Sequence, residues 1–248
     1  MKNLAMVIII ISWMFGLTGD ELVQKMEDRI TPKDSKVDMV MTLTNKKGKT
    51  RESSLRSITK DDGNKQIIWF LSPADDKGVS LLKIEHNDKD DEMRMWLPAF
   101  KKIRRISAKK RSDSFMGSDM SYEDMSTRQL DEFRFKIKGN EMYQDVPCHL
   151  LESTPKEQIR TEYSRHITWV DSTLLIALKE ESYDKSGILL KDKNFSYTVI
   201  KDYQILTEIR VTNIQKNHTT SLTFEIIKLD SGVEDNLFHE RYLKRLPK

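Results

Sequence analysis

The residue types that usually carry enzyme or metal chemistry are present in this chain, but they are not arranged for it. Five histidines are scattered along the sequence, at His86, His149, His166, His218 and His239. None forms an H-x-x-x-H or H-E-x-x-H pair, so their spacing gives no support for a zinc site. The sequence also lacks a glycine-rich phosphate loop and a G-x-S-x-G elbow. We therefore expect a protein that is not an enzyme and holds no cofactor.

The densest group of serines and acids lies near the middle of the chain. Ser114 and Ser118 have acidic neighbours, but no histidine nearby in the sequence provides a general base. Asp119, Glu123 and Asp124 offer oxygen ligands of the kind calcium accepts, yet they lack the spacing of an EF-hand loop. Acids in the first turn of a helix have a simpler role, because they complement the helix dipole. We expect no metal here.

The elements that must position these side chains are a basic hairpin, a long loop and a short helix. Met93–Leu97 alternates with the period of a strand, Pro98 breaks it, and Lys102–Ile106 reads as the returning strand. The polar loop Ser107–Asp119 follows and contains one apolar anchor, Phe115. The next residues, Ser-Tyr-Glu-Asp, predict a capping box and a short helix. Loops of this length are typically lids or binding loops, or are disordered.

Lysine and arginine are concentrated in the stretch Lys101–Arg111, although the net charge of the whole chain is only +3. The overall balance is too even to indicate a nucleic-acid partner. Two interpretations of the basic stretch remain open. It is either a solvated face, or a surface that contacts an anionic membrane or an acidic partner.

The first residues have the layout of a secretory signal peptide. Lys2 precedes the apolar run Leu4–Phe15, and small residues follow as far as Gly19. The run is shorter than the roughly 20 apolar residues that span a membrane. We therefore predict a signal peptide over residues 1–19 and a single exported domain over residues 20–248.

Strands dominate the remaining sequence. Apolar and polar residues alternate in segments such as Lys36–Thr44 and Arg160–Val170, and turn signals separate these segments at regular intervals. This pattern indicates one large antiparallel sheet that curls into a barrel or half-barrel. The helical segments, Asp20–Ile30 and Val233–Phe238, are too small to cover both faces. Cys148 is the only cysteine, which excludes an internal disulfide.

Several strands are apolar on one face and charged on the other, so a curled sheet would have one inner face to fill. Short helices or a ligand must fill it, and the pattern leaves a packed core and a ligand cavity both open. Methionine suits irregular partners because its side chain is flexible. We predict that the inner face includes Met39, Met41, Met93, Met95, Phe133, Phe135, Ile167 and Trp169.

The central stretch also carries a family resemblance. Trp96-Leu-Pro98, then Arg104-Arg105-Ile106, then Asp113–Asp124 resemble, in order and spacing, the central motif of the LolA-like outer membrane lipoprotein-sorting protein family. Phe70-Leu-Ser-Pro73 fits the same layout. The motif residues that we assign to a lid loop are Trp96, Pro98, Arg104, Arg105, Phe115, Gly117, Ser118, Asp119, Tyr122 and Asp124.

The resemblance implies a mainly β fold, a strongly curved antiparallel half-barrel with short helices as a lid over a hydrophobic cavity. It implies a monomeric periplasmic carrier of a lipid or of lipoprotein acyl chains, with an RND-type membrane transporter as a possible partner. Within the loop we expect Phe115 to point inward, Gly117 to allow a turn, and Asp119 and Asp124 to hold the loop by hydrogen bonds. The alternative is a non-catalytic envelope interaction module, or a transporter accessory subunit, with a packed core.

Overall fold

The computed structural model describes residues 16–86, 89 and 91–247. Most of the expected signal peptide, residues 1–15, lies outside these described residues. The strands are β1 (Asp34–Thr44), β2 (Thr50–Lys60), β3 (Lys65–Ser72), β4 (Ser80–Ile84), β5 (Glu92–Leu97), β6 (Lys102–Arg105), β7 (Phe133–Tyr143), β8 (Val146–Pro155), β9 (Tyr163–Asp171), β10 (Ala177–Asp184), β11 (Leu189–Ile200), β12 (Tyr203–Asn213) and β13 (His218–Leu229). The α-helices are α1 (Gly19–Glu27) and α2 (Glu240–Leu243), and the 3₁₀ turns are η1 (Pro98–Phe100), η2 (Ala108–Lys110), η3 (Glu123–Met125) and η4 (Asp235–Phe238).

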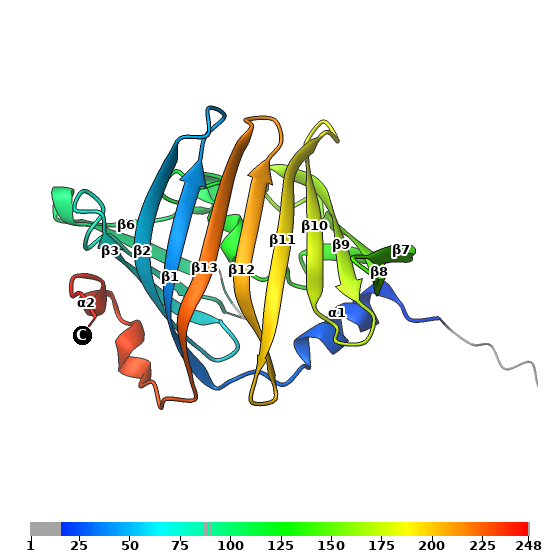
Figure 1. The fold of residues 1–248 in the computed structure, drawn as a ribbon, viewed down its shortest axis with the longest axis horizontal. Coiled ribbons are helices and arrows are strands. Elements are labelled where there is room, and N and C mark those ends of the chain that lie inside the picture. Colours follow the sequence, from blue (N-terminus) through cyan, green and yellow to red (C-terminus); the bar gives the residue numbers. More distant parts are fainter. Residues whose placement is uncertain (1–15, 87–88, 90, 248) are drawn as a thin grey trace, which may run out of the picture.

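All these strands belong to one strongly curved sheet, in which every neighbouring pair is antiparallel (Figure 1). Their order is β6-β5-β4-β3-β2-β1-β13-β12-β11-β10-β9-β8-β7. The first and last strands of the chain therefore pair at the centre, and β6 and β7 are the two free edges. The prediction of a mainly β, antiparallel half-barrel is confirmed. No helix among the described residues is long and apolar enough to cross a membrane.

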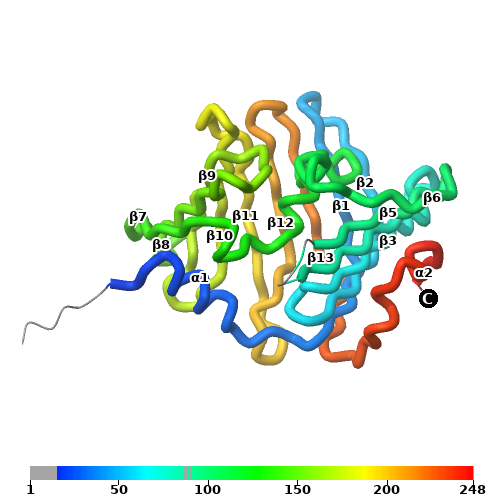
Figure 2. Tube along the Cα trace, turned by 180° about the vertical axis from the view of Figure 1, so that it is seen from behind, coloured from blue at the N-terminus to red at the C-terminus, as the bar shows by residue number. Residues whose placement is uncertain are grey.

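One connection joins the two edges of the sheet. The chain leaves β6 and reaches β7 through residues 106–132, which cross the concave side of the sheet (Figure 2). The helix predicted after Ser121 is wrong, because only the single 3₁₀ turn η3 forms there. The backbone N–H of Ser121 donates to the Asp124 carboxylate, which is one half of the predicted capping box. The Ser121 hydroxyl also donates to this carboxylate, and the Asp124 N–H donates to the Ser121 carbonyl and not to the hydroxyl. Tyr122 and Asp124 are held at different places on the sheet, however, and the chain is extended again at Ser126.

Helix α1 covers the concave face of the other half of the sheet, as Figure 2 shows. Its apolar residues Leu22 and Val23 are buried against strands β8 and β9. Thr18 caps the helix in a capping box with Glu21. A side chain at Gly19 would place its Cβ 2.4 Å from the carbonyl of Phe135, so only glycine allows this close packing. The predicted helix is confirmed, although it ends at Glu27 and not at Ile30.

Strand β3 is buried on both faces, which explains its nearly continuous apolar sequence. Ile68 and Phe70 belong to an apolar cluster on the concave face. Ile67 and Trp69 belong to a second cluster on the convex face, which the C-terminal segment with η4 and α2 covers. The C-terminal segment is fixed there by hydrogen bonds from Trp69 Nε1 and Ser80 Oγ to its backbone carbonyls.

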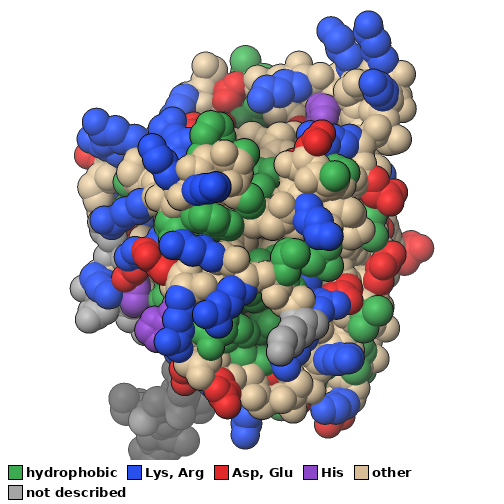
Figure 3. All heavy atoms as spheres, turned by 90° about the vertical axis from the view of Figure 1, so that its left-hand side faces the viewer, with side chains coloured by type: hydrophobic (Ala, Val, Ile, Leu, Met, Phe, Trp, Pro, Cys, Tyr) green, Lys and Arg blue, Asp and Glu red, His purple; other side chains and the backbone are tan. Residues whose placement is uncertain are grey.

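The β5–β6 hairpin forms an exposed basic tip at one end of the sheet. Phe100, at its turn, is 69% exposed. Lys101, Lys102, Arg104 and Arg105 beside it are also exposed. Figure 3 views this end of the molecule and shows many lysine and arginine side chains with apolar side chains between them.

Candidate functional site

The concave face beneath the central loop is lined with methionines. Met39 and Met41 of β1 and Met93 and Met95 of β5 are all at most 4% exposed and belong to one apolar cluster. Alternation along each strand places these pairs on the same face. In this structure they line a closed, packed cluster.

The central loop supplies the side chains that close this cluster. Phe115 is 2% exposed, and its ring centroid lies 5.8 Å from that of Phe70 and 5.9 Å from that of Tyr122. The Tyr122 hydroxyl donates to the sulfur of Met95. A turn beginning at Phe115 directs its ring inward, and Gly117 in this turn has a φ of +79°. The loop therefore acts as an apolar plug on the methionine face.

Asp119 anchors the loop to β13. Its carboxylate lies 2.6 Å from His218 Nδ1 and accepts a hydrogen bond from Thr220 Oγ1 at 2.8 Å. Its backbone N–H also donates to Thr220 Oγ1. Asp119 and Thr220 are buried, so this anchor is largely shielded from water.

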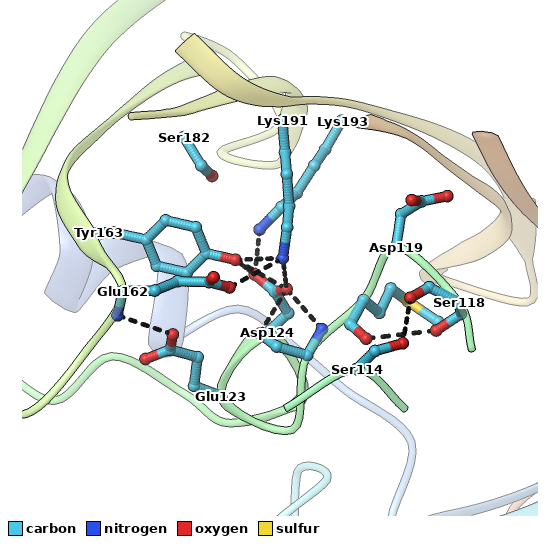
Figure 4. Close-up of polar contacts among 12 residues, drawn as sticks. Ser114, Ser118, Asp119, Glu123, Asp124, Glu162, Tyr163, Ser182, Lys191 and Lys193 are labelled. Atoms are coloured by element: carbon cyan, nitrogen blue, oxygen red, sulfur yellow. Dashed lines mark hydrogen bonds and ion pairs between the residues drawn. The ribbon is translucent and has the colours of Figure 1, made fainter. Parts of the chain in front are cut away.

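Asp124 anchors the loop at a second place, on β11 (Figure 4). Its carboxylate accepts hydrogen bonds from Lys191 Nζ at 2.9 Å, from Lys193 Nζ at 2.5 Å and from the Tyr163 hydroxyl at 3.0 Å. The side chains of Asp124, Lys191 and Lys193 are only 3%, 5% and 6% exposed. A buried ion pair is stable only with such complete pairing.

The network continues along β10. Lys193 Nζ lies 3.0 Å from Glu180, which is also held bidentately by Arg128 at 2.6 and 2.8 Å. Lys191 Nζ lies 3.2 Å from the partly exposed Glu162. Three cations and three carboxylates thus meet at this wall of the half-barrel, and their formal charges cancel.

Burial and charge together fix the protonation of this network. Burial alone would raise the pKa of Asp124, but Lys193 and Lys191 outweigh it and hold that pKa well below its usual range. Burial likewise opposes ionisation of Glu180, yet Arg128 and Lys193 lower its pKa well below the ordinary value. Burial and the charge of Asp124 raise the pKa of Tyr163 well above 10. The carboxylates are therefore ionised and the phenol is neutral at pH 7.

A cavity of about 980 Å³ opens beside the ionic network. Central-loop residues, the start of β7 and residues 158–161 line it, and Asp124, Arg128, Tyr163 and His166 form part of its wall. The lining is largely polar and includes Arg105. Of the eight residues predicted for a hydrophobic cavity, only Phe133 is among those that line it.

Comparisons with known proteins bear on what this arrangement is for. A family model with the description "uncharacterized protein" matches residues 62–245. A crystal structure described as an outer membrane lipoprotein-sorting protein domain, from Vibrio parahaemolyticus, is 30% identical with a TM-score of 0.86, over 92% of this chain and 98% of that chain. The chain belongs to the LolA-like outer membrane lipoprotein-sorting protein family. The resemblance noted in the sequence is thereby confirmed.

Other solved structures agree with this family assignment. A DUF1329 family protein from Desulfovibrio piger is 32% identical with a TM-score of 0.83, over 91% of this chain and 97% of that chain. A LolA superfamily protein from Nitrosomonas europaea is 19% identical with a TM-score of 0.72, over 92% of this chain and the whole of that chain, and shows the shared fold. A search among curated proteins gives no match.

Two of the predicted inner-face residues of this family member lie elsewhere. Trp169 lies beside Tyr143, with the two rings tilted and their centroids 6.5 Å apart, and Lys179 Nζ lies 4.6 Å from the Trp169 ring centroid. Its neighbour Thr168 instead donates to the buried Glu180. By strand alternation Ile167 shares the face of Trp169, so both residues point away from the concave side. The inner-face prediction for Ile167 and Trp169 is wrong because this part of the inner face is polar, whereas inner faces are usually apolar.

The structure does not bring Phe135 and several of the predicted motif residues together, because they lie in different parts of the fold. Phe135 packs near α1. Trp96 faces the C-terminal segment, with Lys244 Nζ 5.4 Å from its ring centroid. Pro98 begins the η1 turn. Arg104 is exposed, and Ser118 Oγ donates to a backbone carbonyl in its own loop.

The buried wall of lysines and acids is the part of the site that sequence reasoning missed. Lys191 and Lys193 alternate on β11, and Glu180 and Ser182 alternate on β10. In the sequence such residues read as a solvated outer face, because isolated charges are rarely buried. The one signal in the sequence was an uninterrupted run of polar residues on each of two adjacent strands, 179–182 and 191–194.

One serine–histidine pair lies within the described residues. Ser182 Oγ is 2.9 Å from His166 Nδ1, and both side chains are buried beside Arg128 and Glu180. His218 and Thr220 both contact the carboxylate of Asp119 and are not joined by a hydrogen bond. Ser114 Oγ donates to the carbonyl of Ser118. Among the described residues, no group of three or more histidines, cysteines and acids is placed to hold a metal ion.

Proposed function

We propose that this protein is a non-catalytic periplasmic carrier that binds a lipid, or the acyl chains of a lipoprotein, on the concave face of its sheet. The observation that carries the proposal is the loop plug. The methionine face is closed by an irregular loop, residues 106–132, and not by a layer of regular structure. A loop held by a few anchors can leave and expose the face, whereas a packed layer cannot.

The energetics suit a carrier that must load and release its cargo. Each buried methylene contributes about 0.8 kcal/mol, so ten contribute about 8 kcal/mol. Association costs of at least about 4 kcal/mol reduce that gain. Removal of Phe115 and Tyr122 from the methionine face reduces it further. The remaining affinity is modest, which allows release to a partner. An RND-type membrane transporter is the partner that we propose.

A second candidate is a non-catalytic envelope interaction module with a permanently packed core. The observation that favours it is the complete closure of the methionine cluster, with Phe115 only 2% exposed. The two candidates differ in one respect. A carrier must open its loop to take up a ligand, and an interaction module keeps the loop closed.

A reversible crosslink separates the two candidates. The side chains of Asp119 and Thr220 are in direct contact, with 2.8 Å between a carboxylate oxygen and Thr220 Oγ1, so we choose the variant Asp119→Cys/Thr220→Cys for the disulfide. The native Cys148 is buried and does not compete. We expect the reduced variant to take up a fluorescent fatty acid and the oxidised variant to lose this uptake by at least about tenfold, as measured by fluorescence titration.

The matched control joins two strands without touching the loop. Ser35 and Thr59 lie opposite each other on β1 and β2, with side-chain oxygens 2.6 Å apart. Oxidised Ser35→Cys/Thr59→Cys should take up the probe as well as its reduced form does. Equal uptake by the oxidised and reduced loop variants would refute the plug. Absence of uptake by the wild-type protein would favour the interaction module.

A further inference from the structure

The loop that closes the concave face has the chemical layout of an amphiphile. Phe115 and Tyr122 pack into the methionine cluster. Asp124 follows Tyr122 by two residues, and its carboxylate pairs with the buried Lys191 and Lys193. Figure 4 shows the Asp124 carboxylate below Lys191 and Lys193, which extend from the wall towards it. One short segment thus places apolar groups in an apolar region and a single anion in a cationic region.

The cationic region, Lys191 and Lys193, is formed by buried side chains whose positions the surrounding strands fix. Lys191 and Lys193 as whole residues are 4% and 5% exposed, and both project from β11 into the interior. Tyr163, 2% exposed, adds a hydroxyl that donates to the same carboxylate. Burying two lysines side by side is costly unless an anion is bound between them. In the closed structure Asp124 is that anion.

The charge balance specifies what must replace Asp124. Lys191, Lys193 and Arg128 face Asp124, Glu162 and Glu180, so the closed network is neutral. If residues 113–125 leave while Arg128 stays on Glu180, one positive charge remains uncompensated. A ligand with one negative charge restores the balance, and a neutral or zwitterionic ligand does not.

Space for a headgroup already exists next to this site. Asp124 and Tyr163 form part of the wall of the 980 Å³ cavity. Its lining carries both arginines (Arg105, Arg111, Arg128 and Arg160) and acids (Glu27, Asp91, Glu123, Asp131 and Glu132). Lys191 and Lys193 do not line the cavity themselves, but Asp124, which lies between the cavity and the two lysines, does. A headgroup would therefore reach the lysine pair at the place that the Asp124 carboxylate now occupies.

We propose that the cargo is an amphiphile with a single negative charge, whose headgroup replaces the Asp124 carboxylate on Lys191 and Lys193. Its apolar chain replaces Phe115 and Tyr122 on the methionine face. The central loop is thus an internal competitor that occupies both halves of the ligand site when no cargo is bound. This inference rests on the proposed carrier function and adds the class of headgroup to it.

The test compares two lysophospholipids that share one palmitoyl chain. Lysophosphatidylglycerol carries one net negative charge and lysophosphatidylcholine carries none. Each is titrated, below its critical micelle concentration, against a neutral fluorescent probe bound to the wild-type protein. We expect lysophosphatidylglycerol to bind about 10- to 100-fold more tightly, the range for hydrogen bonds to a charged group. Glycerophosphoglycerol, which has the headgroup but no chain, should not displace the probe.

Charge-balanced variants locate the selectivity. Asp124→Asn/Lys191→Gln removes one charge of each sign from the site and should reduce the selectivity ratio to near 1. The control, Lys179→Gln/Asp192→Asn, removes an ion pair between the same two strands, β10 and β11, with 3.2 Å between the charged atoms. It should keep the wild-type ratio. Circular dichroism checks that each variant folds. If Asp124→Asn/Lys191→Gln does not fold, the ratio of the two lysophospholipid affinities in the wild-type protein still tests the inference.

The outcomes distinguish the two proposals. If neither lysophospholipid displaces the probe from the wild-type protein, the carrier function fails. If both bind with equal affinity, the carrier function holds and the headgroup inference is overturned. A preference for lysophosphatidylglycerol that survives in folded Asp124→Asn/Lys191→Gln also overturns it. Displacement by glycerophosphoglycerol alone would mean a site for free phosphodiesters, and would overturn the inference too.

Discussion

At the scale of single residues, the protein buries charged side chains such as Lys193 on the concave face of the sheet, where apolar side chains are expected. Lys193 shows the physical compromise. Burial alone would lower its pKa, but Asp124 and Glu180 outweigh burial and raise it. Asp124 belongs to the central loop and Glu180 to strand β10, so the loop supplies part of the negative charge that favours the charged lysine. The position of the central loop is therefore coupled to the charge on Lys191 and Lys193 through the contacts that Asp124 makes with them.

His166 gives a pH prediction at this scale. It is 1% exposed and contacts Arg128 and Ser182, with Glu180 at 3.6 Å. Burial, and then the positive charge of Arg128, lower its pKa well below 6.5. The folded state therefore keeps it neutral, while the unfolded state takes up a proton below about pH 6.5. Its contribution to stability is complete above that pH and is lost as pH falls.

The expected loss in the free energy of unfolding from pH 7.5 to pH 5.5 is about 1.4 kcal/mol for one such histidine. His166→Gln should show a pH dependence weaker by this amount in urea unfolding followed by tryptophan fluorescence. His149→Gln leaves His166 in place and should retain the wild-type dependence. A His166→Gln variant as pH-sensitive as the wild type would contradict a neutral, buried histidine.

At the scale of elements, the two coverings of the concave face differ in kind. Helix α1 packs Leu22 and Val23 onto β8 and β9 through ordinary apolar burial. The central loop instead combines apolar insertion at Phe115 with polar anchors at Asp119 and Asp124. The loop buries apolar residues such as Phe115, Met120 and Tyr122, but over the described residues 106–132 it has no regular secondary structure beyond short 3₁₀ turns, and irregular segments open at lower free-energy cost than packed helices. We therefore expect the loop, and not α1, to be the moving part.

The start of α1 gives a prediction about element stability. Thr18 Oγ1 accepts from Glu21 N, and the Glu21 carboxylate accepts from Thr18 N at 2.8 Å. Thr18→Ala should lower the free energy of unfolding by about 1 kcal/mol, because the helix loses its N-cap. Thr18→Ser keeps the cap and should stay within a few tenths of a kcal/mol of the wild type. Equal losses in both variants in urea unfolding would argue against a capping role.

This helix start also bears on the expected signal-peptide boundary. A mature chain that begins at Asp20 would lack both Thr18 and Gly19. N-terminal sequencing of the exported protein would show whether cleavage leaves the cap in place. The boundary after Gly19 stays a prediction.

At the scale of the whole molecule, the basic hairpin tip is separate from the lysine wall inside the half-barrel. Phe100 and the neighbouring Lys101 and Lys102 are exposed at the turn of the hairpin. Figure 3 shows many basic side chains, with apolar ones between them, on this end of the molecule. An exposed aromatic ring among basic residues suits contact with an anionic membrane surface. A carrier that delivers lipid must approach a membrane, and this tip is the surface that we propose for it.

Vesicle binding tests this surface. A lysine near an anionic membrane contributes about 1 kcal/mol, so Lys101→Gln/Lys102→Gln should weaken binding to phosphatidylglycerol vesicles by roughly 30-fold. The measurement is co-sedimentation at low salt, with phosphatidylcholine vesicles as the uncharged comparison. Lys46→Gln/Lys47→Gln, in the exposed β1–β2 turn, makes the same charge change and should have little effect. Equal weakening by both pairs would indicate a non-specific effect of net charge.

The sequence by itself determined the features that depend on neighbours along the chain. Period-2 alternation and regular turns indicated a curved antiparallel sheet, and the helix near Leu22 was predicted from its apolar periodicity. The methionines of β1 and β5 lie two residues apart on each strand, and the structure places all four in one apolar cluster. That they bind a ligand stays a prediction. The ordered motif from Trp96 to Asp124 indicated the family.

Only the tertiary structure decided which groups meet across the half-barrel. Asp124 lies 67 residues from Lys191 in the chain, and no local pattern encodes their pairing. Trp169 was assigned to the wrong face because a buried ionic network reverses the usual rule that apolar residues point inward. The closure of the methionine face also depends on a loop that joins the two edges of the sheet. Long-range pairing of this kind is fixed by the complete fold, because each buried charge is stable only when its distant partner is present.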